Sequence, residues 1–338
     1  MGQSDCQEGV NMCTCITFNN GDFYFGRNLD LEYRFGEQVV ITPRNYRIKF
    51  KENPEYTSHY GMIGMATVVE NYPLYAEAAN EKGLCMAGLN FPGNASYKEV
   101  KKEAVNVAPY ELIPWLLGRC STVKEAREML TDVNIINQPF TANLPCAPLH
   151  WMLADREECI VLEAVEEGVK IYENPWGVLT NNPPFPFYQS YLCNYMNLSS
   201  QPPINRFAEK LDLNPYGQGM GGIGLPGDAS PASRFVKAAF LKWNSKCAQE
   251  ENANISQFFH ILDGVSMVQG SVITPEGKCD ITTYSCCINT NQGTYYYKTY
   301  ENNQIQAVRM QESHLTGQEL LTYPLPTTQN INWQNKTS

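Results

Sequence analysis

Residues 12–30, which read MCTCITFNNGDFYFGRNLD, are the stretch of this chain that says most about its fold. Two runs rich in aromatic and β-branched residues, Thr14 to Phe18 and Phe23 to Leu29, lie on either side of the tetrapeptide NNGD. Runs of this kind are typical of strands, and Asn-Gly-Asp is typical of a tight turn between them. The segment therefore predicts a β-hairpin.

Cys13 stands at the head of the first strand of this hairpin, directly after Met12. A loop of three residues would set Cys13 opposite Arg27, and a loop of two or four would set it opposite Asn28. Either register brings a guanidinium and the carboxylate of Asp30 close to the thiol. The guanidinium would favour the thiolate, and the carboxylate could orient a cationic amine.

This position of Cys13 suggests a nucleophile at the N-terminus of a processed chain. Once Met12 is removed, the α-amine of Cys13 has an ordinary pKa of about 7.7–8.0 and can act as base for its own thiol without a histidine. The competing interpretation is a buried structural cysteine, which is the commoner role of an arbitrary cysteine. The hairpin partners favour the catalytic interpretation.

The rest of the chain predicts an α+β fold with antiparallel sheets, because strands and helices come in blocks and do not alternate. A second hairpin is expected around the turn at 80–83, between strand-like runs at 74–79 and 84–90. Capping residues predict helices that start after Thr122, Ser230 and Ser256. The helix after Ser230 is expected to bury one apolar stripe, made by Val236, Ala239, Phe240 and Trp243.

Composition excludes several classes of protein. The formal net charge of −10 argues against a nucleic-acid partner and against adsorption to an anionic membrane. No apolar run is long enough to span a bilayer, and the first twelve residues lack the apolar core of a signal peptide, so we expect a cytoplasmic protein. Its twelve cysteines are then mostly reduced. Four histidines and no Cys-x-x-Cys pair make a metal site unexpected.

Two further segments bear on function. Residues 219–224 match the dinucleotide fingerprint G-x-G-x-x-G, but Pro215 precedes them and Leu-Pro-Gly follows, so the strand and helix that the fingerprint needs are missing. We expect a loop there and no nucleotide cofactor. The Pro- and Asn-rich stretch at 183–215 is expected to form a long excursion that contacts another subunit or rims the substrate site.

Six motifs follow one another along the chain: MCT (12–14), FGRNLD (25–30), NEKGL (80–84), AGLNFP (87–92), GVLTN (177–181) and PASRF (231–235). Together with PLHW at 148–151 and YYY at 295–297, they resemble the choloylglycine hydrolase family. That family contains bile salt hydrolases and penicillin V acylases. The resemblance extends from Met12 to about Tyr323, which is nearly the whole chain.

The resemblance implies a four-layer αββα sandwich, an assembly of four identical chains, a bacterial cytoplasmic location and no cofactor. It also assigns one catalytic role to each of six residues: Cys13 as nucleophile, Arg27 at the sulfur, Asp30 holding the α-amine, the Asn181 side chain and the Asn90 backbone N–H as oxyanion donors, and Arg234 steadying the charged site. Without the motifs, the last three would be read as a turn residue, a strand-end residue and a surface arginine.

The chain departs from the family pattern at its beginning, because eleven residues precede Met12. While they remain attached, Cys13 carries an amide and the catalytic base is missing. We therefore expect residues 1–12 to be absent from the active form, through a start at Met12 or, as the second possibility, through cleavage of a propeptide. Residues 13–338 are expected to form a single hydrolase domain.

The resemblance implies cleavage of glycine- or taurine-conjugated bile salts. Loops at 33–35, 67–69 and 137–140 could line the broad apolar pocket that a steroid needs. Bile salt hydrolases of this family tend to have Asn where penicillin V acylases have Tyr, and Asn90 favours bile salts. Penicillin V acylase activity is the alternative within the family. The alternative from another class is a non-catalytic binder of bile acids whose Cys13 is blocked.

Overall fold

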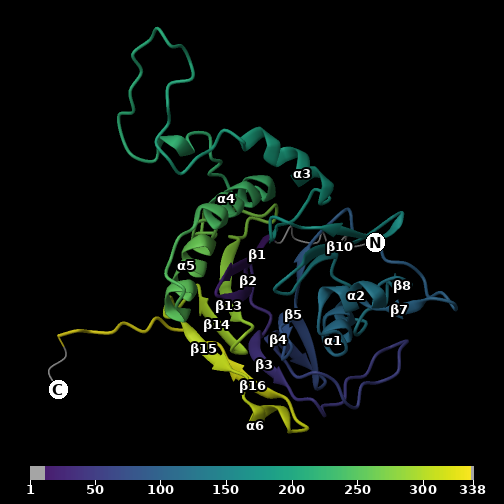
Figure 1. The fold of residues 1–338 in the computed structure, drawn as a ribbon. Coiled ribbons are helices and arrows are strands. Elements are labelled where there is room, and N and C mark those ends of the chain that lie inside the picture. Colours follow the sequence, from purple (N-terminus) through teal and green to yellow (C-terminus); the bar gives the residue numbers. More distant parts are fainter. Residues whose placement is uncertain (1–11, 336–338) are drawn as a thin grey trace.

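The computed structural model describes residues 12–335, so the segment expected to be absent from the active form lies, except for Met12, outside the described residues. Two antiparallel sheets lie face to face, and helices cover their outer faces, as Figure 1 shows. Helices α4 (Pro231–Asn244) and α5 (Glu251–Asp263) pack on the first sheet, and α1 (Leu112–Leu117) packs on the second. The predicted four-layer αββα sandwich is confirmed.

The first sheet has six strands in the order β12-β1-β2-β13-β14-β15, and every neighbouring pair in it is antiparallel. The predicted hairpin supplies two adjacent strands of it, β1 and β2. The strands span Val178–Leu179 (β12), Met12–Asn20 (β1), Asp22–Leu31 (β2), Ile281–Asn289 (β13), Thr294–Thr299 (β14) and Gln306–Arg309 (β15).

The second sheet has eight strands in the order β11-β10-β9-β6-β5-β4-β3-β16, again antiparallel throughout. The expected hairpin around residues 80–83 joins β5 to β6, with Ala79 opposite Cys85. The strands span Gly168–Glu173 (β11), Cys159–Val165 (β10), Leu149–Ala154 (β9), Cys85–Asn90 (β6), Tyr72–Asn80 (β5), Met62–Val69 (β4), Gln38–Thr42 (β3) and Leu321–Pro324 (β16).

Smaller elements complete the chain. A short parallel pair, β7 (Val105–Val107) and β8 (Val133–Ile135), lies outside the two large sheets. The remaining helices are α2 (Val123–Met129), α3 (Pro186–Leu192) and α6 (Glu312–Leu315), with single 3-10 turns at Pro109–Glu111, Cys193–Tyr195 and Met220–Gly222. The last of these turns lies in the glycine-rich stretch, which forms the loop that its sequence predicted.

Strand β6 shows why both faces of the second sheet are apolar. Cys85, Ala87 and Leu89 are buried in the cluster between the sheets, while Met86 points the other way into the cluster that holds α1. Burying one large apolar side chain contributes about 1.5–3 kcal/mol. The two clusters therefore fix the sheets against each other and against their helices.

The register of the first hairpin differs from the expected one. Cys13 lies opposite Leu29, and Cys15 lies opposite Arg27. The turn is centred on Gly21, whose positive φ of 78° is the conformation that glycine adopts most easily, and not on Asn20. Both predicted registers were therefore wrong, and the Arg27 side chain reaches Cys13 as a diagonal neighbour on the same face.

Two helix predictions also need correction, although the caps at Thr122 and Ser230 are confirmed. Helix α5 begins at Glu251, so Ser256 lies inside it and caps nothing. The earlier start is fixed by tertiary contact, because Asn254 bonds to Asn20 in the hairpin turn. In α4 the buried face is centred on 234–239, and Trp243 is 64% exposed, so the predicted stripe is rotated.

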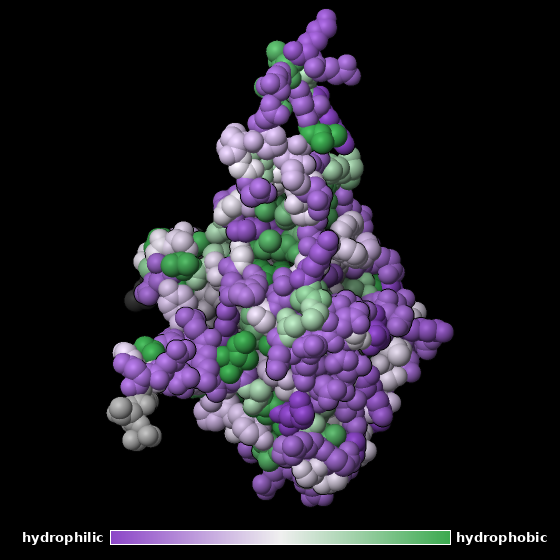
Figure 2. All heavy atoms as spheres, turned by 60° about the vertical axis from the view of Figure 1, so that its left-hand side comes forward, coloured by the Kyte–Doolittle hydropathy of each residue, from purple (hydrophilic) through white to green (hydrophobic). Residues whose placement is uncertain are grey.

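The excursion predicted at 183–215 continues to about residue 230 and projects from the body, as Figures 1 and 2 show. It contains α3 and two of the 3-10 turns but no strand. Several large apolar side chains in it are at least 48% exposed: Met196, Ile204, Phe207, Leu211, Leu213, Tyr216 and Ile223. Such exposure is unusual for a monomer and is typical of a contact surface.

Candidate active site

The site is built around the Cys13 sulfur, at the second residue of β1. Cys13 is 2% exposed, and its sulfur accepts hydrogen bonds from Arg27 Nη2 at 2.5 Å and from the backbone N–H of Asn90. Burial raises the pKa of the thiol above its ordinary 9.0, whereas Arg27, that N–H and Arg234 lower it. Among residues 12–335 no histidine hydrogen-bonds the sulfur. Deprotonation therefore requires another base.

Arg27 is held from several sides. Its guanidinium donates to the carbonyl oxygens of Gly88 at 2.5 Å and Ala76 at 3.4 Å, and it lies 3.8 Å from the carboxylate of Glu77. The preceding residue has to be glycine, because a Cβ at Gly26 would overlap the backbone oxygen of Cys286 on β13. The FGRNLD motif thus places a fully buried guanidinium against the thiol.

Glu77 is a site residue that the sequence analysis missed. It is fully buried, and it accepts hydrogen bonds from the hydroxyls of Tyr284 at 2.8 Å and Tyr295 at 2.6 Å, from the adjacent first sheet. Burial raises the pKa of Glu77, although Arg27 and both hydroxyls oppose the rise. The one sequence signal was a lone acidic residue inside the otherwise uncharged run YPLYAEAAN at 72–80.

Asp30 pairs in the hairpin with Met12, next to Cys13 in the chain, and besides burial its charge raises the pKa of the Cys13 thiol. Its Oδ1 accepts from the Thr282 hydroxyl at 2.6 Å, and its buried Oδ2 has no hydrogen-bond partner among residues 12–335. Burial raises the pKa of Asp30 from 3.8 to about 6, against the lowering effects of Arg234 and Thr282. An open, buried carboxylate oxygen here is suited to receive a cation.

Asn181 and Arg234 close the other side of the site. Asn181 Oδ1 accepts from the backbone nitrogen of Cys13 at 2.9 Å and from Arg234 at 2.7 Å, while its Nδ2 donates to the Asn90 carbonyl at 2.8 Å. Arg234, in the first turn of α4, also donates to the Cys13 carbonyl and to the Thr14 hydroxyl. All six predicted residues therefore meet around Cys13, from five separate segments of the chain.

A second carboxylate near this cluster was also missed. Asp280 is 1% exposed, and within residues 12–335 no side chain hydrogen-bonds its carboxyl oxygens, although the backbone N–H of Ile281 lowers its pKa. Burial first, and then the charges of Asp30 and Glu32, raise the pKa of Asp280 to about 7. It stands directly before β13, and nothing in its sequence context distinguishes it from a loop aspartate.

An apolar cavity of about 320 Å³ adjoins the site. It is lined by residues from all three loops that the sequence predicted, including Phe35, Val69 and Phe140, and by aromatic residues around Tyr110. Ala76, whose carbonyl accepts from Arg27, also lines it. The six candidate residues do not line the cavity, but Ala76 places it next to Arg27, so it could hold the hydrophobic part of a substrate.

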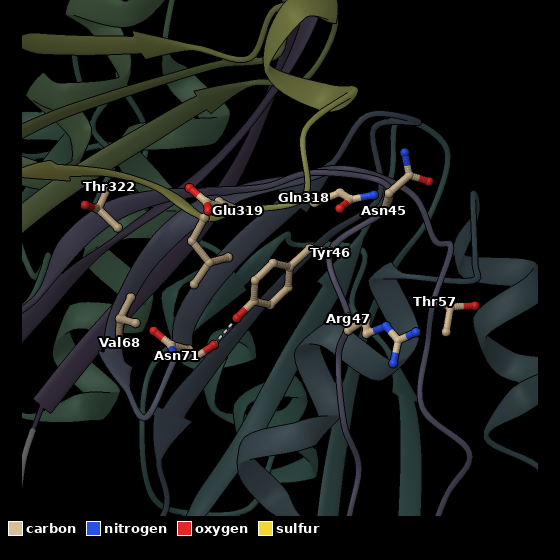
Figure 3. Close-up of a pocket in the computed structure, with 10 residues that line it drawn as sticks. Asn45, Tyr46, Arg47, Thr57, Val68, Asn71, Gln318, Glu319 and Thr322 are labelled. Atoms are coloured by element: carbon tan, nitrogen blue, oxygen red, sulfur yellow. Dashed lines mark hydrogen bonds between the residues drawn. The ribbon is translucent and has the colours of Figure 1, made fainter.

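A larger cavity of about 830 Å³ lies elsewhere and has a polar lining, which Figure 3 shows. Tyr46, Arg47 and Glu319 belong to it, and the Tyr46 hydroxyl donates to the Asn71 carbonyl. None of the six candidate residues lines this cavity, and neither does Ala76, whose carbonyl links the smaller apolar cavity to Arg27. Its size alone therefore does not make it the reactive site.

The described residues offer no metal site. Within residues 12–335 no three His, Cys, Asp or Glu side chains cluster in a way that could hold a metal ion. In the same part of the chain, every helix falls short of the length and apolarity that a membrane span needs. The eleven cysteines of this part are all free thiols.

A comparison with family models matches residues 13–323 to the one described as linear amide C–N hydrolases, choloylglycine hydrolase family. The match begins at Cys13. Among curated proteins, the chain is 50% identical to a bile salt hydrolase/transferase of Lactiplantibacillus plantarum, over 93% of this chain and 97% of that protein. A protein with the same name from Clostridium perfringens is 41% identical, over 96% and 100% of the two chains.

Solved structures of a bile acid hydrolase and a penicillin V acylase are also similar to this chain. The crystal structure of a mutant of the conjugated bile acid hydrolase from Clostridium perfringens is similar, with a TM-score of 0.89 and 39% identity, covering 96% of this chain and 100% of that one. A penicillin V acylase from Agrobacterium tumefaciens shares the fold, with a TM-score of 0.71 at 19% identity over 92% and 90% of the chains.

Proposed function

This chain belongs to the choloylglycine hydrolase family of linear amide C–N hydrolases, and from that premise we propose that it cleaves glycine- or taurine-conjugated bile salts, with Cys13 as nucleophile. The observation that carries the proposal is the cluster of Cys13, Arg27, Asp30 and Asn181 beside an apolar cavity. Its relatives at 50% and 41% identity are named for bile salts, which supports this substrate class.

The proposed active form begins at Cys13, with residues 1–12 absent and residues 13–338 forming one domain. Two observations support this start. The family match begins at Cys13, and the buried Oδ2 of Asp30 lacks a partner among residues 12–335. A free α-ammonium at Cys13 would bring a cation to that oxygen.

The reaction follows from these contacts. The α-amine of Cys13 takes the thiol proton, and the thiolate adds to the amide carbon. The Asn90 N–H and one Asn181 Nδ2–H stabilise the oxyanion, and the loss of such a donor typically costs about 10²–10³ in rate. The C–N bond then breaks, the α-ammonium protonates the departing glycine or taurine nitrogen, and the acyl group stays as a thioester. Water, deprotonated by the same amine, hydrolyses the thioester and frees the thiol.

Arg27 and Arg234 have different tasks in this scheme. Arg27 touches the sulfur and stabilises the thiolate, whereas Arg234 bonds to Asn181 Oδ1 and to the Cys13 carbonyl. Arg234 therefore orients the Asn181 amide so that its nitrogen faces the oxyanion. No cofactor takes part in any step.

The thioester also explains a second outcome. Relatives at 50% and 41% identity are named hydrolase/transferase. An amine that enters in place of water would attack the same thioester and receive the acyl group, with loss of its proton to the Cys13 amine. We include acyl transfer to an amine as a second activity of the same site.

The proposal extends to assembly and location. We place the enzyme in the bacterial cytoplasm as a homotetramer. The exposed apolar side chains of the projection at 196–223 support contact between subunits, because an isolated chain would leave them in water. The other expectation for this segment is that it forms a rim of the substrate site. Replacement of residues 201–216 by a short linker would then raise KM without changing the assembly.

A direct comparison of substrates tests the function. Purified protein should cleave glycocholate or taurocholate with a much higher kcat/KM than penicillin V, because the apolar cavity and Asn90 favour the bile salts. A reversed ratio would make the protein a penicillin V acylase. Binding of bile acids without turnover, by a protein whose mass shows an intact N-terminus, would support the non-catalytic binder.

A further inference from the structure

We propose that His150, paired with Glu163, is a positioning residue that holds both oxyanion donors, Asn90 and Asn181, in register. The inference rests on the proposed function, because that function assigns the oxyanion to these two residues. His150 and Glu163 are both fully buried, and they face each other across strands β9 and β10. Their contacts reach the neighbours of both donors.

The first contact leads to Asn181. His150 Nε2 lies 3.0 Å from the carbonyl oxygen of Thr180. A carbonyl oxygen can only accept, so Nε2 carries the hydrogen and donates it. Thr180 immediately precedes Asn181, and its backbone is therefore anchored to the imidazole just before the residue that bonds to Cys13 and Arg234.

The second contact leads to Asn90. The imidazole stacks on the ring of Phe91, with centroids 4.3 Å apart and planes inclined by 6°. Phe91 immediately follows Asn90, and its backbone nitrogen donates to Pro148 at 2.7 Å. Strand pairing provides a further contact, because His150 lies opposite Leu89, the residue before Asn90, where β6 pairs with β9. One ring thus touches the chain beside each donor.

Glu163 fixes the orientation of that ring. Its Oε1 lies 3.2 Å from His150 Nδ1 and also accepts from the backbone nitrogen of Phe185 at 2.9 Å. Its Oε2 is buried without a hydrogen-bond partner among residues 12–335. A buried pair with an unsatisfied oxygen is a poor way to gain stability, since well-packed apolar residues often do as well or better. We therefore assign the His150–Glu163 pair to orienting the imidazole and not to stabilising the fold.

The site has two parts with separate tasks. Arg27 and Asp30 act on the thiol and the α-amine, and His150 hydrogen-bonds neither of them. Loss of His150 should therefore disturb oxyanion stabilisation while the thiol keeps its reactivity. Alkylation of Cys13 by iodoacetamide measures the second property alone, because that displacement develops no oxyanion.

Two substitutions test the two contacts. His150→Phe keeps a ring for the Phe91 stack but removes the donor to Thr180, and His150→Gln keeps an N–H donor but removes the ring. Met152→Leu is the matched control, since Met152 lies on the same face of β9 and is equally buried. Each protein is assayed for glycocholate turnover, for p-nitrophenol release from p-nitrophenyl acetate in a single turnover, and for Cys13 alkylation followed by peptide mass spectrometry.

Both His150 variants should lose about 10- to 100-fold in kcat and in the rate of p-nitrophenol release, because a displacement of a catalytic group by about 1 Å can cost about 10²-fold in rate. KM and the rate of Cys13 alkylation should stay within about threefold of wild type. Met152→Leu should match wild type in every assay. If His150→Phe fails to fold, His150→Gln and Glu163→Gln carry the same comparison.

Two results would overturn the inference: turnover within about threefold of wild type in a folded His150 variant, or alkylation that falls in parallel with turnover. The ester separates this inference from the proposed function. If the wild-type protein ignores glycocholate yet acylates with the ester, the substrate assignment is wrong and the ester series still decides the role of His150. If it does neither, both proposals are wrong.

Discussion

Replacing Asp30 by Asn should make protein that retains Met12 more stable, and it should make the form that begins at Cys13 much less active. The substitution keeps the shape of the side chain and the hydrogen bond from Thr282, but it removes the charge that we assign to holding the Cys13 α-ammonium. The two effects have opposite signs, and the structure gives the size of the first.

The pKa of Asp30 is raised from 3.8 to about 6, chiefly by burial. Because the folded-state value is the higher one, the fold binds this proton more tightly than the unfolded chain does. The contribution of Asp30 to stability is therefore greatest below about pH 4, and it falls by about 3 kcal/mol in all as the pH rises through about 6. Asp30→Asn escapes this loss, so it should be up to about 3 kcal/mol more stable at about pH 8 and nearly unchanged at about pH 4.

The length of the chain should modulate this gain. In protein that retains Met12, the nitrogen of Cys13 is an amide and brings no charge to Asp30. In protein that begins at Cys13, the α-ammonium pairs with the carboxylate, so Asp30→Asn should gain less or lose stability. Activity of this short form should fall by about 10²–10⁴, the usual contribution of a placed base.

Urea denaturation at about pH 4 and pH 8, for both chain lengths with and without the substitution, measures the coupling between Asp30 and the α-amine as a double-mutant cycle. Glycocholate turnover of the same four proteins gives the catalytic effect. Equal stability changes in the two chain lengths, together with unchanged activity of the short variant, would refute the assigned ion pair.

The structure supports four further predictions. Cys13→Ala should abolish hydrolysis with an unchanged melting temperature, and Cys13→Ser should retain activity lower by orders of magnitude, since its hydroxyl is a weaker nucleophile; near-normal turnover by either would assign the chemistry elsewhere. Glu77→Ala should cost about 3–5 kcal/mol in urea denaturation because it strands the buried Arg27, and a loss below about 1 kcal/mol would contradict the ion pair. Phe140→Asp should raise KM for glycocholate while Cys13 alkylation stays constant, and an unchanged KM would remove the apolar cavity from the substrate site. Replacing 201–216 by a short Gly-Ser linker should lower the molecular mass in light scattering, whereas an unchanged mass with a raised KM would make the segment a substrate rim.

Much of the fold follows from local sequence. The hairpin at 12–30, the hairpin at 80–83 and the caps at Thr122 and Ser230 were predictable, because turn residues and capping side chains act over a few neighbours. The register of the first hairpin was not. It depends on which residue takes the positive φ, and both Asn20 and Gly21 are compatible with a turn.

The start of α5 shows a different limit. Ser256 is a good capping residue, but the contact of Asn254 with the turn at Asn20 lies 234 positions away in sequence and extends the helix toward its N-terminus. Trp243 of α4 is exposed for a similar reason, since the sheet beneath determines which face of the helix is buried. Long-range packing overrides local preference in both cases.

The site divides in the same way. Cys13, Arg27 and Asp30 were found from the predicted hairpin and the other three residues through motifs, and the structure brings all six together. Glu77 and His150 contact the site residues or their neighbours and do not react themselves. They were not found as functional residues, because each acts through partners in other segments of the chain. Glu77 meets Tyr284 and Tyr295, which lie 207 and 218 positions further along the chain.

The central claim is that the α-amine of Cys13 is the catalytic base, and kcat/KM for glycocholate in two versions of the protein tests it most directly. One version begins Met12-Cys13 and should lose its methionine, which the intact mass verifies. In the other, the junction between Met12 and Cys13 is made resistant to cleavage. We expect full activity for the first and about 10²–10⁴-fold less for the second, with recovery after cutting at a protease site placed before Cys13. Equal activity of the short and the uncut protein would contradict this claim.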